Sequence, residues 1–340
     1  MNNLETILTR WTHLNASDAF IEQGDAVRFK VHGETTVQED LAAIQSEQDI
    51  IAFLKEHIPG IDIEGVLQNK KEVDWSLTLG DGTFVRANVY RTSQGVAATL
   101  RYLPNSIPEL EQLWLPEKVL EFPNLKEWLV LVTGTTGSGK STTLASIIHR
   151  INQTRRSNII TLEDPIEYKH SNIHSKVQQR EVWRDTESFR SGLRAALRQA
   201  PDVLLVGELR DYETTSLALT AAQTGILVLG TLHTNGAAST ATRILDIFPP
   251  DSHNQIKTML AETLRWVLWQ ALEKSVQGWR VPICELLLPH AAIRNGDLAA
   301  IQRAINAGKK DGMISKAHFA QELSRDGIIS DEVLAKYPLM

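Results

Sequence analysis

Hydrophobic positions follow two different patterns along the chain, one before about residue 103 and one after about residue 117. In the first part, short apolar runs such as "AVRFKVHG", "DWSLTLGDGTFVRANVYRT" and "GVAATLRYL" predict strands, and "SEQDIIAFLKEHI" predicts a helix. The glycines of "LGDG" are typical of a hairpin turn. The first 25 residues predict a helix followed by a turn, with an apolar face made of Leu4, Ile7, Leu8 and Trp11. We therefore expect residues 1–103 to form a small α+β domain.

A proline-rich stretch follows this domain. Three prolines fall between Pro104 and Pro116, and proline disfavours regular helices and strands. We expect residues 104–116 to be a linker between two domains, because a chain of 340 residues is long enough for two hydrophobic cores.

The second pattern alternates continuous apolar runs with helical stretches. "WLVLVT", "NIITLE", "VLLVG" and "ILVLGTLH" predict strands of a mostly parallel sheet that helices cover on both faces. Residues 117–340 are therefore expected to be an α/β domain, mainly helical from about residue 289. The segment "LRWVLWQAL" is expected to be a helix, on which Trp266 and Trp269 pack in the core or, alternatively, form a partner surface.

Composition narrows the class of protein. A hydrophobic content of 42% and a charged content of 22% are those of a folded globular chain. The single cysteine, Cys284, excludes an internal disulfide framework and a cysteine-based zinc cluster. We expect a cytoplasmic protein, because the sequence has no signal peptide and no run of about 18 apolar residues. A net charge of −6 argues against a general phosphate-backbone binder, so no nucleic acid is expected as a partner.

The segment "GTTGSGKS" fits the phosphate-binding loop G-x-x-x-x-G-K-[ST] at every defined position. It leaves a predicted strand and opens a predicted helix, so its N–H groups and the helix N-terminus can face phosphate. Lys140 is expected to reach the β- and γ-phosphates of ATP, and the Ser141 hydroxyl to bind Mg²⁺. The expected nucleotide contacts here are Gly134, Thr135, Thr136, Gly137, Ser138, Gly139, Lys140, Ser141 and Thr142.

Acidic residues stand at the ends of the next two predicted strands. Hydrolysis needs a group that orients or deprotonates water and a carboxylate near the metal. "ITLEDP" offers Glu163 and Asp164, and "LLVGELRD" offers Glu208, at the edge where open α/β sheets bind ligands. Glu208 has the position of a Walker B acid, although Gly207 stands where many ATPases carry an aspartate.

A histidine, His233, stands at the end of the strand in "VLGTLHTN". A lone histidine beside an apolar strand is usually a core residue. The end of this strand, however, faces the same crevice as the phosphate loop and the acids. We therefore predict that His233 senses the γ-phosphate.

Arginines complete the list of candidates, because they stabilise the charge that spreads over phosphoryl oxygens during transfer. Arg86 and Arg101 are expected on neighbouring strands of the first domain, with Arg91 in the loop between them. The second domain offers Arg194, Arg198 and Arg210. For each of these arginines a surface ion pair is the alternative.

In this order the segments resemble the motifs of the type II/IV secretion ATPase family, most closely the PilT-like motors of type IV pili. "GTTGSGKSTTLA" is similar to the Walker A motif, "ITLEDPIEY" to the Asp box, "LRQAPDVLLVGELRD" to the Walker B motif and "GTLHTNGAA" to the His box. "ASDAFIEQGDAVRFKVHGE" resembles the start of a PAS-like N-terminal domain, and "FVRANVY" and "TLRYLP" its arginine-bearing strands. The resemblance implies a RecA-like P-loop ATPase core with an N-terminal α+β PAS-like domain.

The resemblance also implies an activity and partners. The chain would form a cytoplasmic homohexamer, peripheral at the inner membrane, that hydrolyses ATP to power pilus retraction. It would act on a PilC-like platform protein of the inner membrane, with other pilus ATPases as further partners. The implied roles are general base for Glu208, Mg²⁺ binding through water for Glu163, γ-phosphate sensing for His233, charge stabilisation for Arg86 and Arg101, and nucleotide contact for Asp164 and Arg210.

Three segments depart from the family's pattern. "LRQAPD" has Gln199 and Ala200 in place of two acids, and Ile226 stands where PilT-like proteins have a histidine. After Asn295 the chain lacks the residues "LIRE", which complete a motif associated with retraction. These departures keep open an ATPase of a conjugation-like type IV secretion system or a related assembly step. A nucleic-acid translocase and a module that uses ATP only to assemble are further alternatives.

Overall fold

The computed structural model describes residues 4–14, 16–31, 34–38, 41, 46–57, 65, 67, 72–78, 84–103, 106–288, 298–307 and 312–339. Contacts divide the chain into two units, Met1–Ser106 and Ile107–Met340, and the boundary lies inside the expected linker. Each unit has its own buried apolar core. None of the described helices is both long enough and apolar enough to span a bilayer.

The first unit is built on an antiparallel sheet whose strand order is β3-β2-β1-β6-β5-β4. Side chains alternate across it, so that Val85, Ala87 and Val89 are buried in the core that Trp11 and Ile50 of the two helices complete. The strands are β1 (Asp18–Glu22), β2 (Arg28–Val31), β3 (Glu34–Val37), β4 (Glu72–Thr78), β5 (Phe84–Thr92) and β6 (Gly95–Leu103), and the helices are α1 (Leu4–His13) and α2 (Glu47–His57).

Two details of the first unit differ from the expectations. The first 25 residues contain the strand β1 after the helix α1, and β1 lies in the middle of the sheet. Arg91 lies within β5 and not in a loop, because the turn between β5 and β6 is tight and pairs Thr92 with Gly95. The glycines of the expected hairpin turn lie outside the described residues, but β4 and β5 pair antiparallel as a hairpin requires.

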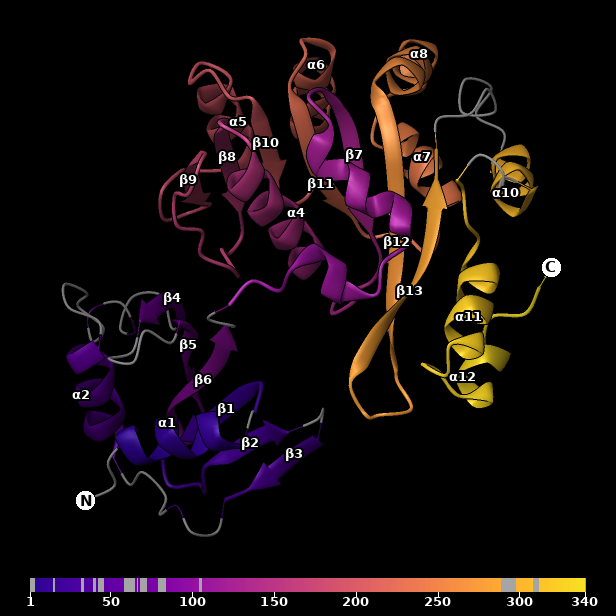
Figure 1. Ribbon diagram of the computed structural model, residues 1–340. Helices are drawn as coiled ribbons and strands as arrows, with labels where there is room; N and C mark the ends of the chain where they lie inside the picture. The colour runs from indigo at the N-terminus through magenta and orange to yellow at the C-terminus, as the bar shows by residue number, and fades with distance from the viewer. Residues whose placement is uncertain are drawn as a thin grey trace. The chain divides into compact units, whose positions relative to one another are not determined.

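The second unit contains a seven-stranded sheet with the order β13-β12-β7-β11-β10-β8-β9 (Figure 1). All neighbours are parallel except the β12–β13 pair. The strands are β7 (Trp128–Thr133), β8 (Asn158–Glu163), β9 (Lys176–Glu181), β10 (Val203–Val206), β11 (Leu227–Leu232), β12 (Leu264–Lys274) and β13 (Arg280–Leu287). The mostly parallel sheet predicted from the apolar runs is confirmed, and β9 is a strand that the sequence analysis did not identify.

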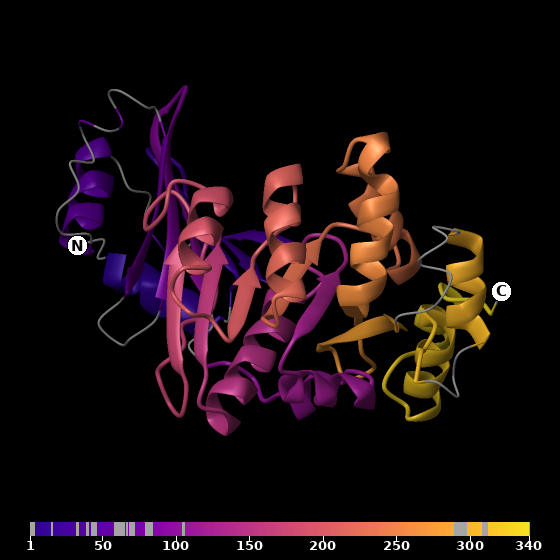
Figure 2. The ribbon, with the colours of Figure 1, turned by 90° about the horizontal axis from the view of Figure 1, so that it is seen from above.

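Helices cover both faces of this sheet (Figure 2). Successive residues of β7 show the division, because Leu129 and Leu131 pack in one core and Val130 and Val132 in the other. The first face carries α5 (Phe189–Ala196), α6 (Tyr212–Gln223), α7 (Ala237–Asp246), α8 (His253–Thr263), which follows the 3₁₀ helix η3 (Pro250–Ser252), and α10 (Leu298–Ala307). The second carries the 3₁₀ helices η1 (Leu110–Leu113) and η2 (Glu117–Asn124), and α4 (Lys140–Thr154), α11 (Lys316–Arg325) and α12 (Asp331–Ala335).

The prediction of a helix at "LRWVLWQAL" is wrong, because this segment is part of strand β12. Residues three apart on a strand point to opposite faces of the sheet. Accordingly, the Trp266 ring packs with its centroid 5.2 Å from that of the Phe122 ring in one core. The Trp269 indole lies in the other core and donates to the backbone oxygen of Thr234 at 2.9 Å. Both side chains are buried, so the alternative of an exposed partner surface is also wrong.

Candidate functional site

The phosphate-loop segment connects β7 to α4 along a path that needs glycine. Gly134, Gly137 and Gly139 have φ values of 142°, 75° and 88°, a region that glycine enters at low cost. A Cβ atom on Gly134 would lie 2.2 Å from the backbone oxygen of Gln270. Gly139 immediately precedes α4, so the loop ends at the N-terminus of a helix. This strand–loop–helix arrangement is the geometry that binds phosphate.

Lys140 is buried at the start of α4 and points back into the loop. Its ammonium donates to the backbone oxygens of Gly134 at 2.9 Å and Thr135 at 2.8 Å. Burial lowers the pKa of Lys140, and the carboxylates of Glu208 and Glu167 oppose that shift. In the same loop the buried Ser138 hydroxyl has no hydrogen-bond partner among the described residues. The loop therefore presents a cation and a free hydroxyl, both of which suit a phosphate ligand.

Gln270, on β12, fixes the loop from the neighbouring strand. Its buried side chain donates from Nε2 to the backbone oxygen of Ser138 at 2.6 Å and accepts from the Thr143 hydroxyl at 3.0 Å. One amide group thus ties both the loop and the first turn of α4 to the sheet. The sequence analysis missed Gln270. The available signal, a polar residue inside an apolar strand, disappears when the segment is interpreted as a helix.

Glu208 follows β10 and lies beside a guanidinium, that of Arg210, and an imidazole, that of His233. The Glu208 side chain is 17% exposed, and Oε2 lies 2.6 Å from Arg210 Nη2 and 3.7 Å from His233 Nε2. The hydrogen bond to Glu208 raises the pKa of Arg210, and the charges of Glu208 and Asp164 add to that effect. The structure therefore brings Glu208, Arg210 and His233 together at the ends of β10 and β11.

The geometry around Gly207 explains the absence of an aspartate before Glu208. A Cβ atom on Gly207 would lie 3.0 Å from the Leu162 oxygen and 3.3 Å from the Glu163 Cα atom. The ends of β8 and β10 are therefore too close for a larger residue unless the backbone moves.

Glu163 ends β8, the strand next to β10, but its surroundings hold no cation partner among the contacts of the described residues. Its Oε1 atom accepts from the Thr161 hydroxyl at 2.6 Å and from Gln179 Nε2 at 3.2 Å. Burial raises the pKa of Glu163 to about 7; these two hydrogen bonds oppose the shift, whereas the carboxylates of Glu167 and Glu181 increase it. Glu163 can therefore exchange a proton near neutral pH, and Asp164, which follows it, is exposed.

The order of strands places these candidates along one edge of the sheet. The carboxyl ends of β7, β11, β10 and β8 carry the phosphate loop, His233, Glu208 and Glu163 in that sequence. Open parallel sheets bind ligands at this edge. Ser141 and Thr142 lie in the first turn of α4 beside it, where the Thr142 hydroxyl lies 2.9 Å from the Tyr168 hydroxyl. Tyr168 is a second residue near the site that the sequence analysis did not identify.

The candidate arginines of the first unit lie on strands of its sheet, and two of them, Arg91 and Arg101, make ion pairs. Arg86 and Arg101 face each other on β5 and β6, as expected from the sequence. Arg101 Nε donates to Asp18 Oδ1 at 2.7 Å, yet the Arg101 side chain remains 56% exposed. Arg91 pairs with Glu47 at 3.0 Å, which is the surface ion pair considered as its alternative.

The residues that depart from the family's pattern lie in different structural surroundings. Ala200 adopts a φ of 50°, which is uncommon for a residue with a side chain, and its backbone oxygen accepts from Asn158 Nδ2 at 3.0 Å. Ile226 packs against the apolar core. Asn295 lies outside the described residues.

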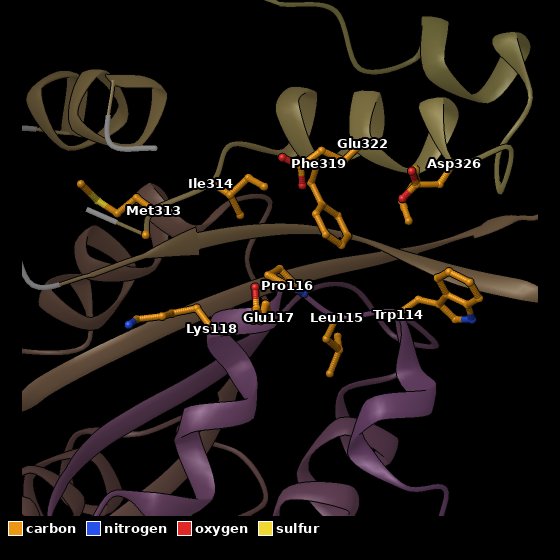
Figure 3. Close-up of a pocket in the computed structure, with 12 residues that line it drawn as sticks. Trp114, Leu115, Pro116, Glu117, Lys118, Met313, Ile314, Phe319, Glu322 and Asp326 are labelled. Carbon is orange, nitrogen blue, oxygen red and sulfur yellow. The ribbon is translucent and has the colours of Figure 1, made fainter. Parts of the chain in front are cut away.

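A cavity of about 390 Å³ lies in the second unit, between the segment Trp114–Lys118 and helix α11 (Figure 3). Its apolar lining includes Leu115 and Phe319, and Glu322 and Asp326 stand at its border. None of its lining residues belongs to the phosphate loop or to the strand ends described above, so it is separate from the candidate site.

Comparison with known proteins relates this geometry to a family. Residues 1–284 match the family described as Type II/IV secretion system protein. The chain is 44% identical over 275 residues to the "Twitching motility protein" of Neisseria gonorrhoeae, covering 78% of this chain and 73% of that protein. It is 42% identical over 265 residues to the "Type IV pilus retractation ATPase PilT" of Pseudomonas aeruginosa, covering 77% of each chain.

A solved structure extends the similarity to the fold. The crystal structure of "the Pilus Retraction Motor PilT and Bound ADP" superposes with a TM-score of 0.88 at 40% identity, covering 98% of this chain and 96% of that one. These findings confirm the predicted fold, a RecA-like ATPase core with an N-terminal α+β domain, and the family to which the sequence motifs pointed.

Proposed function

The chain belongs to the Type II/IV secretion system protein family and is an ATPase of that family, and on this basis we propose that it hydrolyses ATP to power retraction of a type IV pilus. The observation that carries the proposal is the alignment of a phosphate loop, a histidine and two glutamates along one sheet edge. Similarity to a retraction ATPase and to a twitching motility protein over most of the chain supports retraction as the movement that ATP hydrolysis powers.

The residues of this edge fit ATP together with Mg²⁺. The loop N–H groups, Lys140 and the unpartnered Ser138 hydroxyl suit phosphate oxygens. Within the described ranges, no group of three or more His, Cys, Asp or Glu residues could hold a metal ion by itself. Mg²⁺ is usually bound through one or two protein groups plus phosphates and water, which here would be the Ser141 hydroxyl and, through water, Glu163. When bound, Mg²⁺ would neutralise charge on the phosphates.

The protein's own side chains would then divide the work of hydrolysis. Lys140 would leave the loop carbonyls and bind the β- and γ-phosphates. Glu208 would orient the attacking water and accept its proton, held in place by Arg210 at 2.6 Å. His233, 3.7 Å from the Glu208 carboxylate, would respond to the γ-phosphate. Asp164 and Arg210 lie close enough to interact electrostatically and would contact the nucleotide from the β8 and β10 side.

We further propose the assembly that this activity requires. The chain would form a cytoplasmic homohexamer at the inner membrane and act on a PilC-like platform protein, with other pilus ATPases as further partners. Arg86 and Arg101 would be supplied by the N-terminal unit to the bound nucleotide. The exposure of Arg101, despite its ion pair with Asp18, supports this role.

The test is deletion of the gene in a piliated host, complemented by the wild-type gene or by a Lys140→Ala variant. Retraction predicts an excess of fibres and loss of twitching motility, both restored by the wild-type gene only. Unchanged fibres with loss of protein export would instead support the alternative of a secretion ATPase. Unchanged fibres and unchanged motility would contradict the proposal.

A further inference from the structure

Glu285, on β13, is a buried carboxylate for which the proposed reaction has no role. It is 1% exposed and stands between Cys284 and Leu286, both of which are in the apolar core. Burying a carboxylate is costly unless hydrogen bonds compensate it. Both oxygens of Glu285 have such a bond, and each bond reaches a different helix.

The first bond reaches the start of α7. Oε2 accepts from the backbone N–H of Ala237 at 2.7 Å. Ala237 is the first residue of α7 and lies four positions after His233. The residue before it, Gly236, provides no capping side chain, so the carboxylate serves as the cap from a neighbouring strand. A Cβ atom on Gly236 would lie 3.1 Å from Oε2, which shows how closely the carboxylate meets the His233 turn.

The second bond reaches α10. Oε1 accepts from Gln302 Nε2 at 3.2 Å, and the same Nε2 lies 3.3 Å from Asn306 Oδ1. Helix α10 packs against α7 (Figure 1), and Ile301 and Ile305 anchor it in the same core. Glu285 therefore connects the turn that follows β11 with the C-terminal helical region through one side chain on a strand of the sheet.

We propose that Glu285 is a positioning residue that transmits the nucleotide state from the His233 turn to α10. The inference rests on the proposed ATPase function. Because β13 is held in the sheet, a shift of the α7 N-terminus changes the Ala237 bond to Oε2. The two helices share one negative charge, so a change in the first bond alters the strength and geometry of the second. If the His233 turn and α10 are coupled through Glu285, a change at this group must alter the response of α10 to the nucleotide, and that response can be measured.

The test is hydrogen exchange of the full chain with and without a non-hydrolysable ATP analogue and Mg²⁺. In the wild type, we expect exchange of the amides in residues 298–307 to change at least threefold on analogue binding. Gln302→Met removes the bond to Glu285 and should abolish this response while the KM for ATP stays within about twofold. Asn306→Ala is the matched control, because it removes the other partner of the same amide and should retain the wild-type response.

A second variant examines the carboxylate itself. Glu285→Gln keeps an oxygen acceptor for Ala237 but loses the charge, so we expect kcat to fall about fivefold at unchanged KM, together with loss of the α10 response. A merely structural role would lower the melting temperature and leave kcat and the α10 response of the folded chain unchanged, which would overturn the inference. A wild-type response in Gln302→Met would also overturn it. Binding of the analogue without any response in wild-type α10 would overturn the coupling alone, whereas no binding would overturn the ATPase function as well.

Discussion

Two glutamates end neighbouring parallel strands, yet their surroundings are opposite. Glu208, after β10, has a guanidinium 2.6 Å away and an imidazole 3.7 Å away. Glu163, at the end of β8, has a hydroxyl and an amide as donors and two further carboxylates in its electrostatic surroundings. The Glu208 carboxylate is held by the Arg210 guanidinium, and the pKa of Glu163 is raised to about 7.

This difference supports a different role for each glutamate, although in the sequence both stand at the end of an apolar strand. A carboxylate fixed by a guanidinium has a defined orientation and can serve one attacking water in every cycle. A carboxylate whose pKa lies near neutrality changes charge when a cation or a phosphate arrives. We therefore propose Glu208 as the general base and a response to the bound metal nucleotide for Glu163.

The largest expected effect is that of Glu208→Gln. The amide keeps the size of the side chain but cannot accept the proton, so kcat should fall about 100- to 1,000-fold while ATP affinity changes less than threefold. Steady-state phosphate release and binding of a fluorescent ATP analogue measure the two quantities. Glu213→Gln, which breaks a surface pair with Arg190, is the control and should have wild-type kcat. Wild-type turnover of Glu208→Gln would remove it from this role.

His233→Asn, which changes the second neighbour of Glu208, should have a smaller effect than Glu208→Gln. The imidazole neighbours Glu208 without a close hydrogen bond, so its loss should lower kcat about tenfold and leave Glu208 in place through Arg210. The measurement compares kcat and the affinity for ATP of His233→Asn with those of the wild type. Unchanged kcat would show that His233 is an exposed side chain without a part in hydrolysis.

Glu163→Gln tests the other side of the comparison through stability. The pKa of Glu163 is about 7 in the folded chain against 4.5 in the reference state, so folding favours the protonated carboxyl. The contribution of this protonated carboxyl to the free energy of unfolding is fully present below pH 4.5 and is lost as pH rises through 7. Above that range Glu163→Gln should be more stable than the wild type by about 1–3 kcal/mol, with a smaller gain at pH 5. Urea unfolding without nucleotide at both pH values measures this; an equal difference at both would contradict the raised pKa.

The smallest expected effect concerns Ala200, away from both glutamates. Because its φ is 50°, Ala200→Gly should relieve backbone strain and raise stability by about 0.5–1 kcal/mol, measured as a higher melting temperature. The control is Ala195→Gly inside α5, which should lower stability by about 1 kcal/mol. Destabilisation by both changes would show that Ala200 is not strained.

The strand ends could be predicted from sequence because each candidate directly follows a continuous apolar run. Parallel strands then place Lys140, His233, Glu208 and Glu163 at one edge without further information. Gln270 could not be predicted in this way. Both faces of β12 are buried, so its two tryptophans fit a helix as well as a strand until the sheet is known. The different surroundings of the two glutamates arise from burial and from Gln179 on β9, a strand without a sequence signal as strong as those of its neighbours.

Phosphate release from ATP by the purified chain, with Mg²⁺ and with chelator, tests the central claim that the phosphate loop and the strand ends form one hydrolytic site. Lys140→Ala removes the cation that the loop carbonyls hold at 2.9 and 2.8 Å. We predict Mg²⁺-dependent release by the wild type and loss of both nucleotide binding and release in Lys140→Ala. Release by Lys140→Ala at the wild-type rate would contradict the account.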